Sequence, residues 1–229
     1  MYKHFFKRFF DILLSATALA LLFPVFLAVA FMVKIKLGSP VIFKQLRPGK
    51  NAKVFKMYKF RTMTNEKDEN GNLLPDEQRL TKFGKFLRST SLDELPEIWN
   101  ILKGDMSIVG PRPQLVRDMV FFSPEVMARQ SVRPGLTGLA QVNGRNRINW
   151  EERFEWDLKY IKKITLFSDI AVFFKTIGKM LKRSDISAEN SATDTDYGDW
   201  LLESGRITNE EYLNKMEEYK SIINSLGGK

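Results

Sequence analysis

Residues 91–113 read SLDELPEIWNILKGDMSIVGPRP, and this stretch decides how the chain is expected to fold. A Ser followed three residues later by Glu is typical of a capping box, so a helix is predicted to begin at Ser91. Because Pro96 lies late for a cap at Ser91, a start nearer Asp93 stays open as well. Apolar residues recur at helical spacing as far as Leu102, and Gly104 is a natural helix end.

The adjacent acids Asp93 and Glu94 fall in the first turn with either start. The positive end of the helix dipole stabilises negative charge, so Asp93 is expected to be ionised at neutral pH. An ionised Asp can act as a nucleophile or a metal ligand, although plain helix capping is the simpler explanation for this segment taken alone. After the helix, the turn Gly110-Pro111-Arg112-Pro113 holds one Arg stiffly between two prolines.

The composition excludes several kinds of chemistry. The 229 residues include no Cys and a single His, His4, which is expected to be solvated or interfacial. Thiol catalysis, disulfides, Ser-His catalysis and His-rich metal sites are therefore not expected. Any chemistry must use carboxylates, Lys, Arg, hydroxyls or a hard cation bound by oxygen.

Charge is distributed unevenly along the chain, whose net charge is +9. Residues 1–62 carry twelve Lys or Arg and one acid, Asp11, whereas residues 184–229 carry ten acids and four Lys or Arg. A basic front end suits nucleic acid, an anionic membrane surface or a phosphorylated substrate.

Residues 12–33 include no charged residue and are about long enough to span a bilayer as a helix. The stretch is too long for a cleavable signal peptide. Basic residues flank it on both sides, so the positive-inside rule predicts that both flanks stay in the cytoplasm. Pro24 removes a backbone hydrogen bond and favours a kinked helix that enters one leaflet and returns. From charge and proline alone, a transmembrane and a re-entrant helix are equally supported.

Residues 41–63 are rich in Phe, Tyr and Val around the turn signal Arg47-Pro48-Gly49, which predicts two strands joined by a turn. Lys59 and Arg61 are expected on one face of the second strand, where a solvated face is the simplest explanation.

The other elements are predicted from polarity and spacing: a loop over 65–78 and helices over 81–89, 116–130, 150–163, 166–183 and 208–226. The helix over 166–183 is basic and amphipathic, and a position on a membrane surface is favoured slightly over packing on a core. Glycines punctuate residues 133–146, a pattern that lets backbone approach a ligand closely. Residues 184–199 are polar and expected to be loose.

Five stretches of the chain carry a family resemblance. They read KRFFDIL (7–13), VIFKQLRPG (41–49), FKMYKFRTM (55–63), LTKFGKFLRSTSLDELPEIWNILKGDMSIVGPRP (80–113) and VRPGLTGLAQVNGRN (132–146). Together they resemble the small monotopic phosphoglycosyl transferases, which belong to the bacterial sugar transferases. The pairing of Arg-Ser-x-Ser-x-Asp-Glu-Leu-Pro with Gly-Asp-Met-Ser-x-x-Gly-Pro-Arg-Pro is very specific.

The resemblance implies an enzyme that moves a phosphosugar from a UDP-sugar to a polyprenyl phosphate such as undecaprenyl phosphate, with release of UMP and with Mg²⁺ as cofactor. It implies that Asp93 and Glu94 form a catalytic dyad, that Asp93 forms a covalent phosphosugar intermediate, and that Asp93 is the candidate metal ligand. The implied place is the cytoplasmic face of the inner membrane, at the first membrane step of glycoconjugate assembly. The partners are the two substrates, one membrane leaflet and downstream glycosyltransferases, without nucleic acid.

The resemblance also implies an α+β, mostly helical fold with an N-terminal re-entrant membrane helix, interfacial amphipathic helices and a small cytoplasmic α/β region. It therefore favours the re-entrant form of the apolar stretch, although Phe23-Pro24 stands where the family often has Ser-Pro. The expected organisation is a re-entrant helix at 1–36, a catalytic domain at 37–183, and a polar linker with an acidic helical tail at 184–229. Residues 200–229 extend past the resemblance.

The cationic side chains inside the matched motifs are candidates for binding phosphate: Lys59, Arg88, Arg112 and Arg145, with Pro111 and Pro113 holding Arg112 in place. Asp157 falls on a helix after the glycine-rich stretch, and a surface position is expected for it. Two other functions stay open: a membrane-tethered basic module that binds anions without catalysis, and a metal-dependent nucleotide-sugar hydrolase. The anion-binding module leaves the Asp-Glu-Leu-Pro and Gly-Pro-Arg-Pro motifs unexplained.

Overall fold

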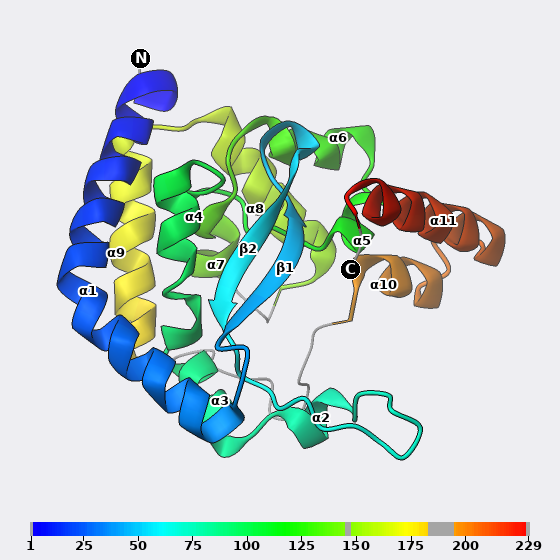
Figure 1. The fold of residues 1–229 in the computed structure, drawn as a ribbon. Helices are drawn as coiled ribbons and strands as arrows, with labels where there is room; N and C mark the ends of the chain where they lie inside the picture. Colours follow the sequence, from blue (N-terminus) through cyan, green and yellow to red (C-terminus); the bar gives the residue numbers. More distant parts are fainter. Residues whose placement is uncertain (1, 145–147, 183–194, 228–229) are drawn as a thin grey trace.

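The computed structural model describes residues 2–144, 148–182 and 195–227, and it is mostly helical with two small sheets (Figure 1). The helices are α1 (Lys7–Leu37), α2 (Asp76–Arg79), α3 (Lys82–Ser89), α4 (Glu97–Lys103), α5 (Val116–Met119), α6 (Pro124–Met127), α7 (Leu139–Asn143), α8 (Trp150–Lys162), α9 (Leu166–Lys182), α10 (Tyr197–Glu203) and α11 (Asn209–Ser225). The strands are β1 (Ile42–Pro48), β2 (Val54–Phe60), β3 (Ser107–Val109) and β4 (Gly135–Thr137). This architecture confirms the mostly helical α+β class.

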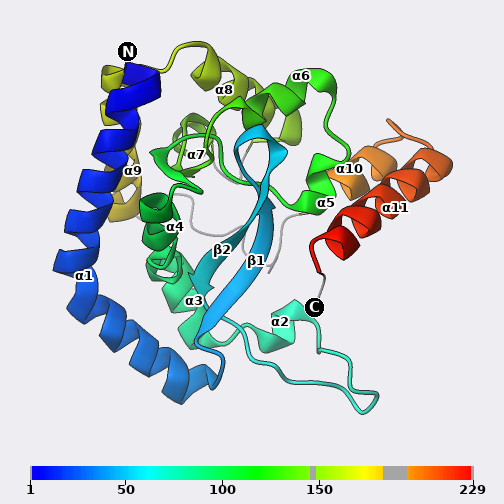
Figure 2. The ribbon, with the colours of Figure 1, turned by 45° about the horizontal axis from the view of Figure 1, so that its top comes forward.

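Helix α1 is long and apolar enough to cross a membrane by length and composition. Only 11% of its apolar window is buried inside the protein, so most of its apolar surface faces outward. Pro24 lies inside the helix, and Figures 1 and 2 show α1 changing direction partway along. A bent apolar helix is thus present where the sequence predicts one.

The first turns of α1 are fastened to the rest of the protein by hydrogen bonds. The guanidinium of Arg8 donates to the carbonyls of Ile101 and Leu102 at the end of α4, at 2.6 and 2.8 Å. One turn later, the carboxylate of Asp11 accepts from the backbone N–H of Ile108 in β3 at 3.0 Å. The charged residues at the start of α1 therefore bind backbone groups of the domain that follows.

The last turns of α1 are held by apolar packing. Val29, Val33 and Leu37 are buried in one cluster with Phe60 of β2 and Leu87 of α3. These three residues recur at intervals of four, which places them on one side of a helix. Both ends of α1 thus contact the same domain.

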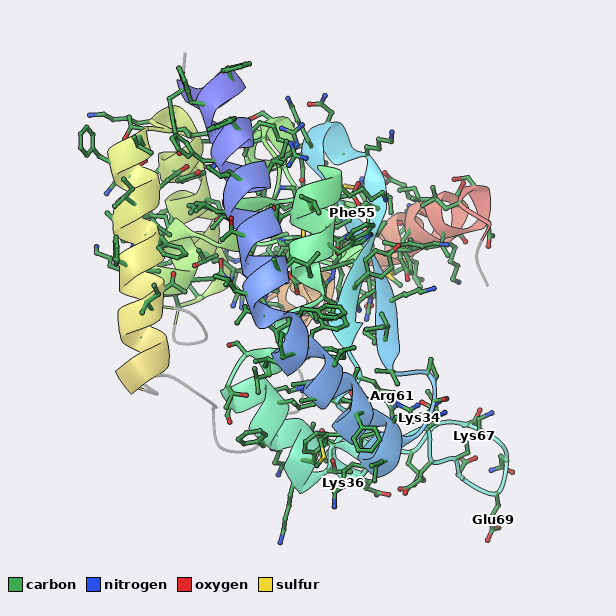
Figure 3. The ribbon with its side chains drawn as sticks, turned by 60° about the vertical axis from the view of Figure 1, so that its left-hand side comes forward. Lys34, Lys36, Phe55, Arg61, Lys67 and Glu69 are labelled. Atoms are coloured by element: carbon green, nitrogen blue, oxygen red, sulfur yellow. The ribbon has the colours of Figure 1, made fainter. Side chains whose placement is uncertain are left out.

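The two strands predicted over 41–63 pair as an antiparallel hairpin, with Ile42 opposite Phe60 and Pro48 opposite Val54. Arg61, directly after β2, is buried and donates to backbone carbonyls, so the expectation of a solvated side chain is wrong for this residue. Figure 3 shows Arg61 close to the C-terminal end of α1, where Lys34 and Lys36 lie.

The loop predicted over 65–78 is confirmed, except that the short helix α2 begins within it. The turn at Asn70-Gly71 is present, with Gly71 at a φ of 81° and its N–H bonded to the carbonyl of Asp68. Helix α3 follows as predicted. Its N-cap is Thr81, whose hydroxyl accepts from the N–H of Gly84 at 3.0 Å.

Strands β3 and β4 lie parallel, and glycines bring their ends together. A Cβ on Gly110 would lie 2.6 Å from the carbonyl oxygen of Arg133, and a Cβ on Gly135 would lie 2.1 Å from the N–H nitrogen of Gly110. No side chain fits at such distances. The glycines at 110 and 135 therefore serve backbone packing against backbone, rather than the approach to a ligand that the sequence suggests for residues 133–146.

The helix predicted over 116–130 is broken into α5, α6 and a tighter turn at Ala128–Ser131. Pro124 begins α6, and the hydroxyl of Ser123 caps it by accepting from Val126. The helices predicted over 150–163 and 208–226 are confirmed as α8 and α11, and Thr208 and Glu211 form the expected capping box.

Helix α10, which precedes the C-terminal helix α11, packs on the main aromatic core. Tyr197 and Leu201 are buried with Trp150 and Phe154 of α8. The expectation of loose chain over 184–199 is therefore wrong from residue 197 onward, and residues 184–194 lie outside the described part of the chain. Figure 1 shows α10 and α11 together on the opposite side of the molecule from α1.

Candidate active site

The two acids of the central motif lie in a tight turn before α4, not in its first turn. Ser91 has a φ of 54° and its side chain makes no cap hydrogen bond, so the predicted capping box is absent. Residues Leu92–Glu94 form a single 3₁₀ turn, and α4 begins at Glu97 after Pro96. The predicted end at Gly104 is confirmed, with a left-handed φ of 102°. After the reversal at Ser91, the carboxylate of Glu94 faces β2, where it accepts from Lys59.

Glu94 is held by two cations. Its Oε1 accepts from Nζ of Lys59 at 2.8 Å and from Nη2 of Arg112 at 2.7 Å. Burial alone would raise the pKa of Glu94, but the ammonium and the guanidinium lower it well below its usual range. Glu94 is therefore ionised, and its carboxylate is already bound by Lys59 and Arg112. Through these bonds it links β2 to the Gly-Pro-Arg-Pro turn.

Asp93 has a different environment from its neighbour. Its side chain is 8% exposed, and within the described ranges no hydrogen bond or ion pair reaches its carboxylate. Burial raises the pKa of Asp93 to about 6, and the charge of Glu94 adds to that rise, while Lys59 and Arg112 oppose it. From the sequence, a helix dipole was expected to stabilise the charge of Asp93 and so to lower its pKa. The pKa is raised instead, because Asp93 is buried and α4 begins later in the chain.

The Arg112 turn is fixed through its backbone. Pro111 and Pro113 are buried, whereas the Arg112 side chain is 40% exposed. The carbonyl of Pro111 accepts from the N–H of Gly135 at 2.9 Å, and the carbonyl of Pro113 accepts from Arg47 at 3.2 Å. The expected stiffness of this turn thus rests on tertiary hydrogen bonds as well as on the two prolines.

Asp157 is buried, which corrects the expectation of a surface position. Its Oδ2 accepts from Nε and Nη2 of Arg129 at 3.0 and 2.6 Å, and both side chains are at most 2% exposed. Nη2 of Arg129 also donates to the carbonyl of Arg112 at 2.6 Å. Asp157 therefore acts on the site indirectly, by orienting the guanidinium that holds the Arg112 backbone.

Glu97 is a site residue that the sequence reasoning missed. It is 2% exposed, and its Oε1 lies 3.1 Å from Nζ of Lys59. Burial raises the pKa of Glu97 to about 7, with Lys59 opposing the rise. The signal in the sequence was its position three residues after Glu94, about one helical turn on, which brings the two carboxylates to one side.

The two remaining candidate cations differ in position. Arg88, at the end of α3, donates from Nε to the hydroxyl of Thr62 at 3.1 Å, and its charge is close enough to oppose the rise in the pKa of Asp93. The structure therefore brings Lys59, Arg88 and Arg112 together around the dyad. Arg145 lies outside the described residues.

The carboxylate of Asp93 can be compared with what a hard cation such as Mg²⁺ requires. Among the residues that the structure describes, no group of three or more His, Cys, Asp or Glu could hold a metal ion by itself. Mg²⁺ does not need such a cage, because it is usually bound by one or two carboxylates, waters and substrate phosphates. A carboxylate without a protein partner, as at Asp93, fits that pattern.

The sequence was compared with known proteins. The family model described as Bacterial sugar transferase matches residues 2–183. The chain belongs to this family. The family is membrane-bound, and its enzymes are sugar transferases, so the idea of an anion-binding module without catalysis is set aside.

Relatives from several bacteria resemble the chain. The uncharacterized sugar transferase EpsL of Bacillus subtilis (strain 168) is 46% identical over 192 residues, covering 82% of this chain and 93% of that protein. The UDP-glucose:undecaprenyl-phosphate glucose-1-phosphate transferase of Klebsiella pneumoniae is 43% identical over 184 residues, covering 76% and 40%. The exopolysaccharide production protein ExoY of Rhizobium meliloti (strain 1021) is 37% identical over 188 residues, covering 75% and 83%. The chain spans about two fifths of the Klebsiella enzyme and of the UDP-galactose-lipid carrier transferase of Erwinia amylovora.

Replacing Arg112 with Lys is expected to lower kcat/KM for sugar transfer by about 10-fold to 100-fold. Lys keeps the charge but loses the planar fork that can hold Glu94 and a phosphate at once. Initial rates with saturating and limiting sugar donor measure the change, and circular dichroism checks the fold. Wild-type rates in the variant would mean that Arg112 is only a turn residue.

The rate of sugar transfer is expected to fall as the pH drops below about 6. Asp93 must be ionised to act as a nucleophile or a ligand, and its pKa is raised to about 6, so each pH unit below that value removes about 90% of the ionised form. A pH–rate profile from 4.5 to 8 measures this. A rate that holds constant down to pH 4.5 would show that the site does not depend on a carboxylate with a raised pKa.

Proposed function

We propose that the protein transfers a sugar 1-phosphate from a UDP-sugar to a polyprenyl phosphate, with undecaprenyl phosphate as acceptor, through a covalent intermediate on Asp93. The observation that carries this proposal is the contrast within the dyad. Glu94 is bound by Lys59 and Arg112, whereas the buried carboxylate of Asp93 is left without a hydrogen bond from the described residues. The names of the Klebsiella relative and of the Salmonella typhimurium undecaprenyl-phosphate galactose phosphotransferase support the substrate classes.

In the first step, an oxygen of Asp93 attacks the phosphorus that bears the sugar. A bond from that oxygen to phosphorus forms, the bond between phosphorus and the bridging oxygen breaks, and UMP leaves with the electron pair. Lys59 and Arg112 supply fixed positive charge where the phosphate charge develops. Arg88 adds positive charge near the carboxylate of Asp93.

In the second step, an oxygen of the lipid phosphate attacks the same phosphorus. The bond to Asp93 breaks, the carboxylate is restored, and a polyprenyl diphosphosugar results. Splitting the reaction lets one small site serve a soluble donor and a membrane-bound acceptor in turn. No net proton is gained or lost by Asp93, so its neighbours need only keep it ionised.

Mg²⁺ is proposed as the cofactor, with Asp93 as its ligand from the chain. When bound, the ion would neutralise phosphate charge that the side chains leave uncompensated. Glu94 is not free to take this role without releasing Lys59 or Arg112.

The test of the proposed function is UMP release measured across a panel of UDP-sugars, with undecaprenyl phosphate and Mg²⁺ supplied. We expect one donor to give UMP and lipid-linked sugar in equal amounts. UMP formed in excess of lipid product, or without lipid, in every condition would instead identify a nucleotide-sugar hydrolase. No UMP from any donor would overturn the proposal.

The attachment of α1 supports a re-entrant position on the cytoplasmic face of the inner membrane. Near the start of α1, Nζ of Lys7 and the hydroxyl of Tyr2 donate to Asp169 of α9 at 2.6 and 2.7 Å. The end of α1 packs on β2 and α3 of the same domain. A helix of 31 residues that crossed the bilayer would place its two ends on opposite sides, about 46 Å apart, and would break one of these attachments.

The exposed apolar side chains of α9 support a surface of the protein that lies on lipid. Phe167 is 82% exposed and Phe174 is 65% exposed, next to Phe173 and Ile170. Figures 1 and 2 show α9 on the same side of the molecule as α1. Together the two helices offer an apolar face suited to one leaflet of a membrane.

Single cysteines at positions 2 and 123 are expected to react equally with an impermeant thiol reagent, and from the cytoplasmic side only. The chain contains no native Cys, so each introduced thiol reports on one place. The reason is that both ends of α1 are bound to one domain. Labelling of Tyr2→Cys from the periplasm, with Ser123→Cys protected, would show that α1 spans the membrane.

A further inference from the structure

A polar hollow lies beside the dyad. It is lined by Arg47, Met57, Lys59, Glu97, Arg112 and Pro113, and its volume is about 20 Å³. That is room for about one water molecule, or for a single oxygen of a phosphate group whose other atoms remain at the opening. The exposed side of Arg112 provides such an opening next to Glu94.

Arg47 enters this hollow from the end of β1. Its Nε and Nη2 donate to the amide oxygen of Gln45 at 3.2 and 2.7 Å, and its Nη1 donates to the carbonyl of Pro113 at 3.2 Å. A guanidinium has five N–H groups, so these three bonds leave two donors for another acceptor. Gln45 and Pro113 fix the plane of the guanidinium and therefore the direction of those two donors.

The acids that favour the charged form of Arg47, namely Asp118, Glu97 and Asp196, do so without forming an ion pair with it. Across residues 2–144, 148–182 and 195–227, no carboxylate forms an ion pair with Arg47, whereas Lys59 and Arg112 both pair with Glu94. Burial and the like charge of Arg112 lower the pKa of Arg47 to about 10, which still leaves it protonated at neutral pH. A desolvated cation beside a second cation is unfavourable unless an anion joins them.

We propose that Arg47 is a further anion-binding residue of this site, and that the hollow takes one oxygen of a substrate phosphate held between Arg47 and Arg112. The inference deepens the proposed function and rests on it for the identity of the anion. Two guanidinium groups provide a rigid receptor, because Gln45 and the carbonyl of Pro113 fix that of Arg47 and the carboxylate of Glu94 fixes that of Arg112. A rigid receptor loses little conformational entropy when a phosphate binds.

Phosphate binding by the full-length protein in detergent tests the proposal without any turnover. Isothermal titration with inorganic phosphate, at constant ionic strength, is carried out on wild type, Arg47→Gln, Arg47→Lys and the control Arg133→Gln. Arg133 also donates from its guanidinium to a backbone carbonyl, that of Gly104 at 2.8 Å, but at the far end of α4 from the dyad. The control therefore removes a similar bond outside the site.

We expect Arg47→Gln to weaken phosphate binding about tenfold, Arg47→Lys to weaken it less, and Arg133→Gln to bind as wild type does. If Arg47→Gln fails to fold, Arg47→Lys carries the test, since it keeps the charge and loses only the fork. Phosphate affinities equal to wild type in the folded Arg47 variants would overturn the proposal.

Steady-state kinetics then identify which phosphate occupies the hollow. A raised KM for the UDP-sugar in Arg47→Gln would assign the hollow to the donor, and a raised KM for polyprenyl phosphate would assign it to the acceptor. Unchanged values for both would count against the proposal. If Arg47→Gln weakens phosphate binding but the wild-type protein releases no UMP from any donor, the anion site is supported and the proposed function is not. If Arg47→Gln binds phosphate as wild type does but the wild-type protein releases UMP, the proposed function is supported and the anion site is not.

Discussion

Replacing Asp93 with Asn is expected to lower UMP release from a UDP-sugar by about a thousandfold or more, both with and without lipid acceptor. Asn has the size of Asp and lacks the anionic oxygen that attacks phosphorus. Because the loss falls on the first half-reaction, adding more polyprenyl phosphate should not restore the rate. A coupled assay for UMP measures the effect.

The same substitution should not destabilise the protein. Burial raises the pKa of Asp93 above that of an unfolded chain, so the folded state binds this proton more tightly, and the ionised side chain costs stability at pH 7. Asn removes that cost, so the melting temperature should stay the same or rise. Wild-type rates in a folded Asp93→Asn protein would exclude Asp93 as the nucleophile.

Glu94→Gln serves as the comparison within the dyad. It should impair turnover, because Lys59 and Arg112 lose the charge that holds them in place. It keeps Asp93, however, so it need not abolish formation of a covalent intermediate. A much slower but measurable burst of UMP in Glu94→Gln, and none in Asp93→Asn, would separate the two roles.

Replacing Asp157 with Asn is expected to lower the free energy of unfolding by about 3–5 kcal/mol, since it leaves the buried guanidinium of Arg129 without its charge partner. Activity should also fall in the fraction that remains folded, because Arg129 holds the carbonyl of Arg112. Urea unfolding followed by tryptophan fluorescence measures the stability.

Glu218→Gln is the matched control for Asp157→Asn. It removes one carboxylate from an ion pair with Lys215 whose side chains are 51% and 45% exposed. Exposed pairs of this kind contribute about 0.2–1 kcal/mol at most. If Asp157→Asn were as stable as Glu218→Gln, the buried pair would have no part in holding the Arg112 turn.

Local signals in the sequence were sufficient for much of the fold. Thr81, Gly104 and Thr208 mark helix ends by their own chemistry, and the helix ends are found there. The hairpin over 41–63 follows from composition and a turn signal. The capping box at Ser91 was wrong because a left-handed backbone at that residue, fixed by the rest of the fold, overrides the local preference.

The candidate site was predicted only where a motif pointed to it. Asp93, Glu94, Lys59 and Arg112 were found in this way, and the structure brings them together. Glu97 was missed because its spacing from Glu94, although visible in the sequence, does not show that it is buried. The pairing of Arg129 with Asp157 was missed because charge pairs between distant parts of a chain leave no pattern in a single sequence. Their burial, and the pKa shifts that follow from it, depend on packing that no local rule describes.

The central claim is a covalent phosphosugar on Asp93, and the most direct measurement is the mass of the protein after incubation with the UDP-sugar alone. In the absence of lipid acceptor the intermediate cannot pass its sugar phosphate on, so wild-type protein should gain the mass of one phosphosugar, located on the peptide that carries Asp93. Asp93→Asn should gain none. An unchanged wild-type mass, with UMP appearing only when donor and lipid acceptor are both present, would contradict the account and leave Asp93 as a ligand or base in a single-step transfer.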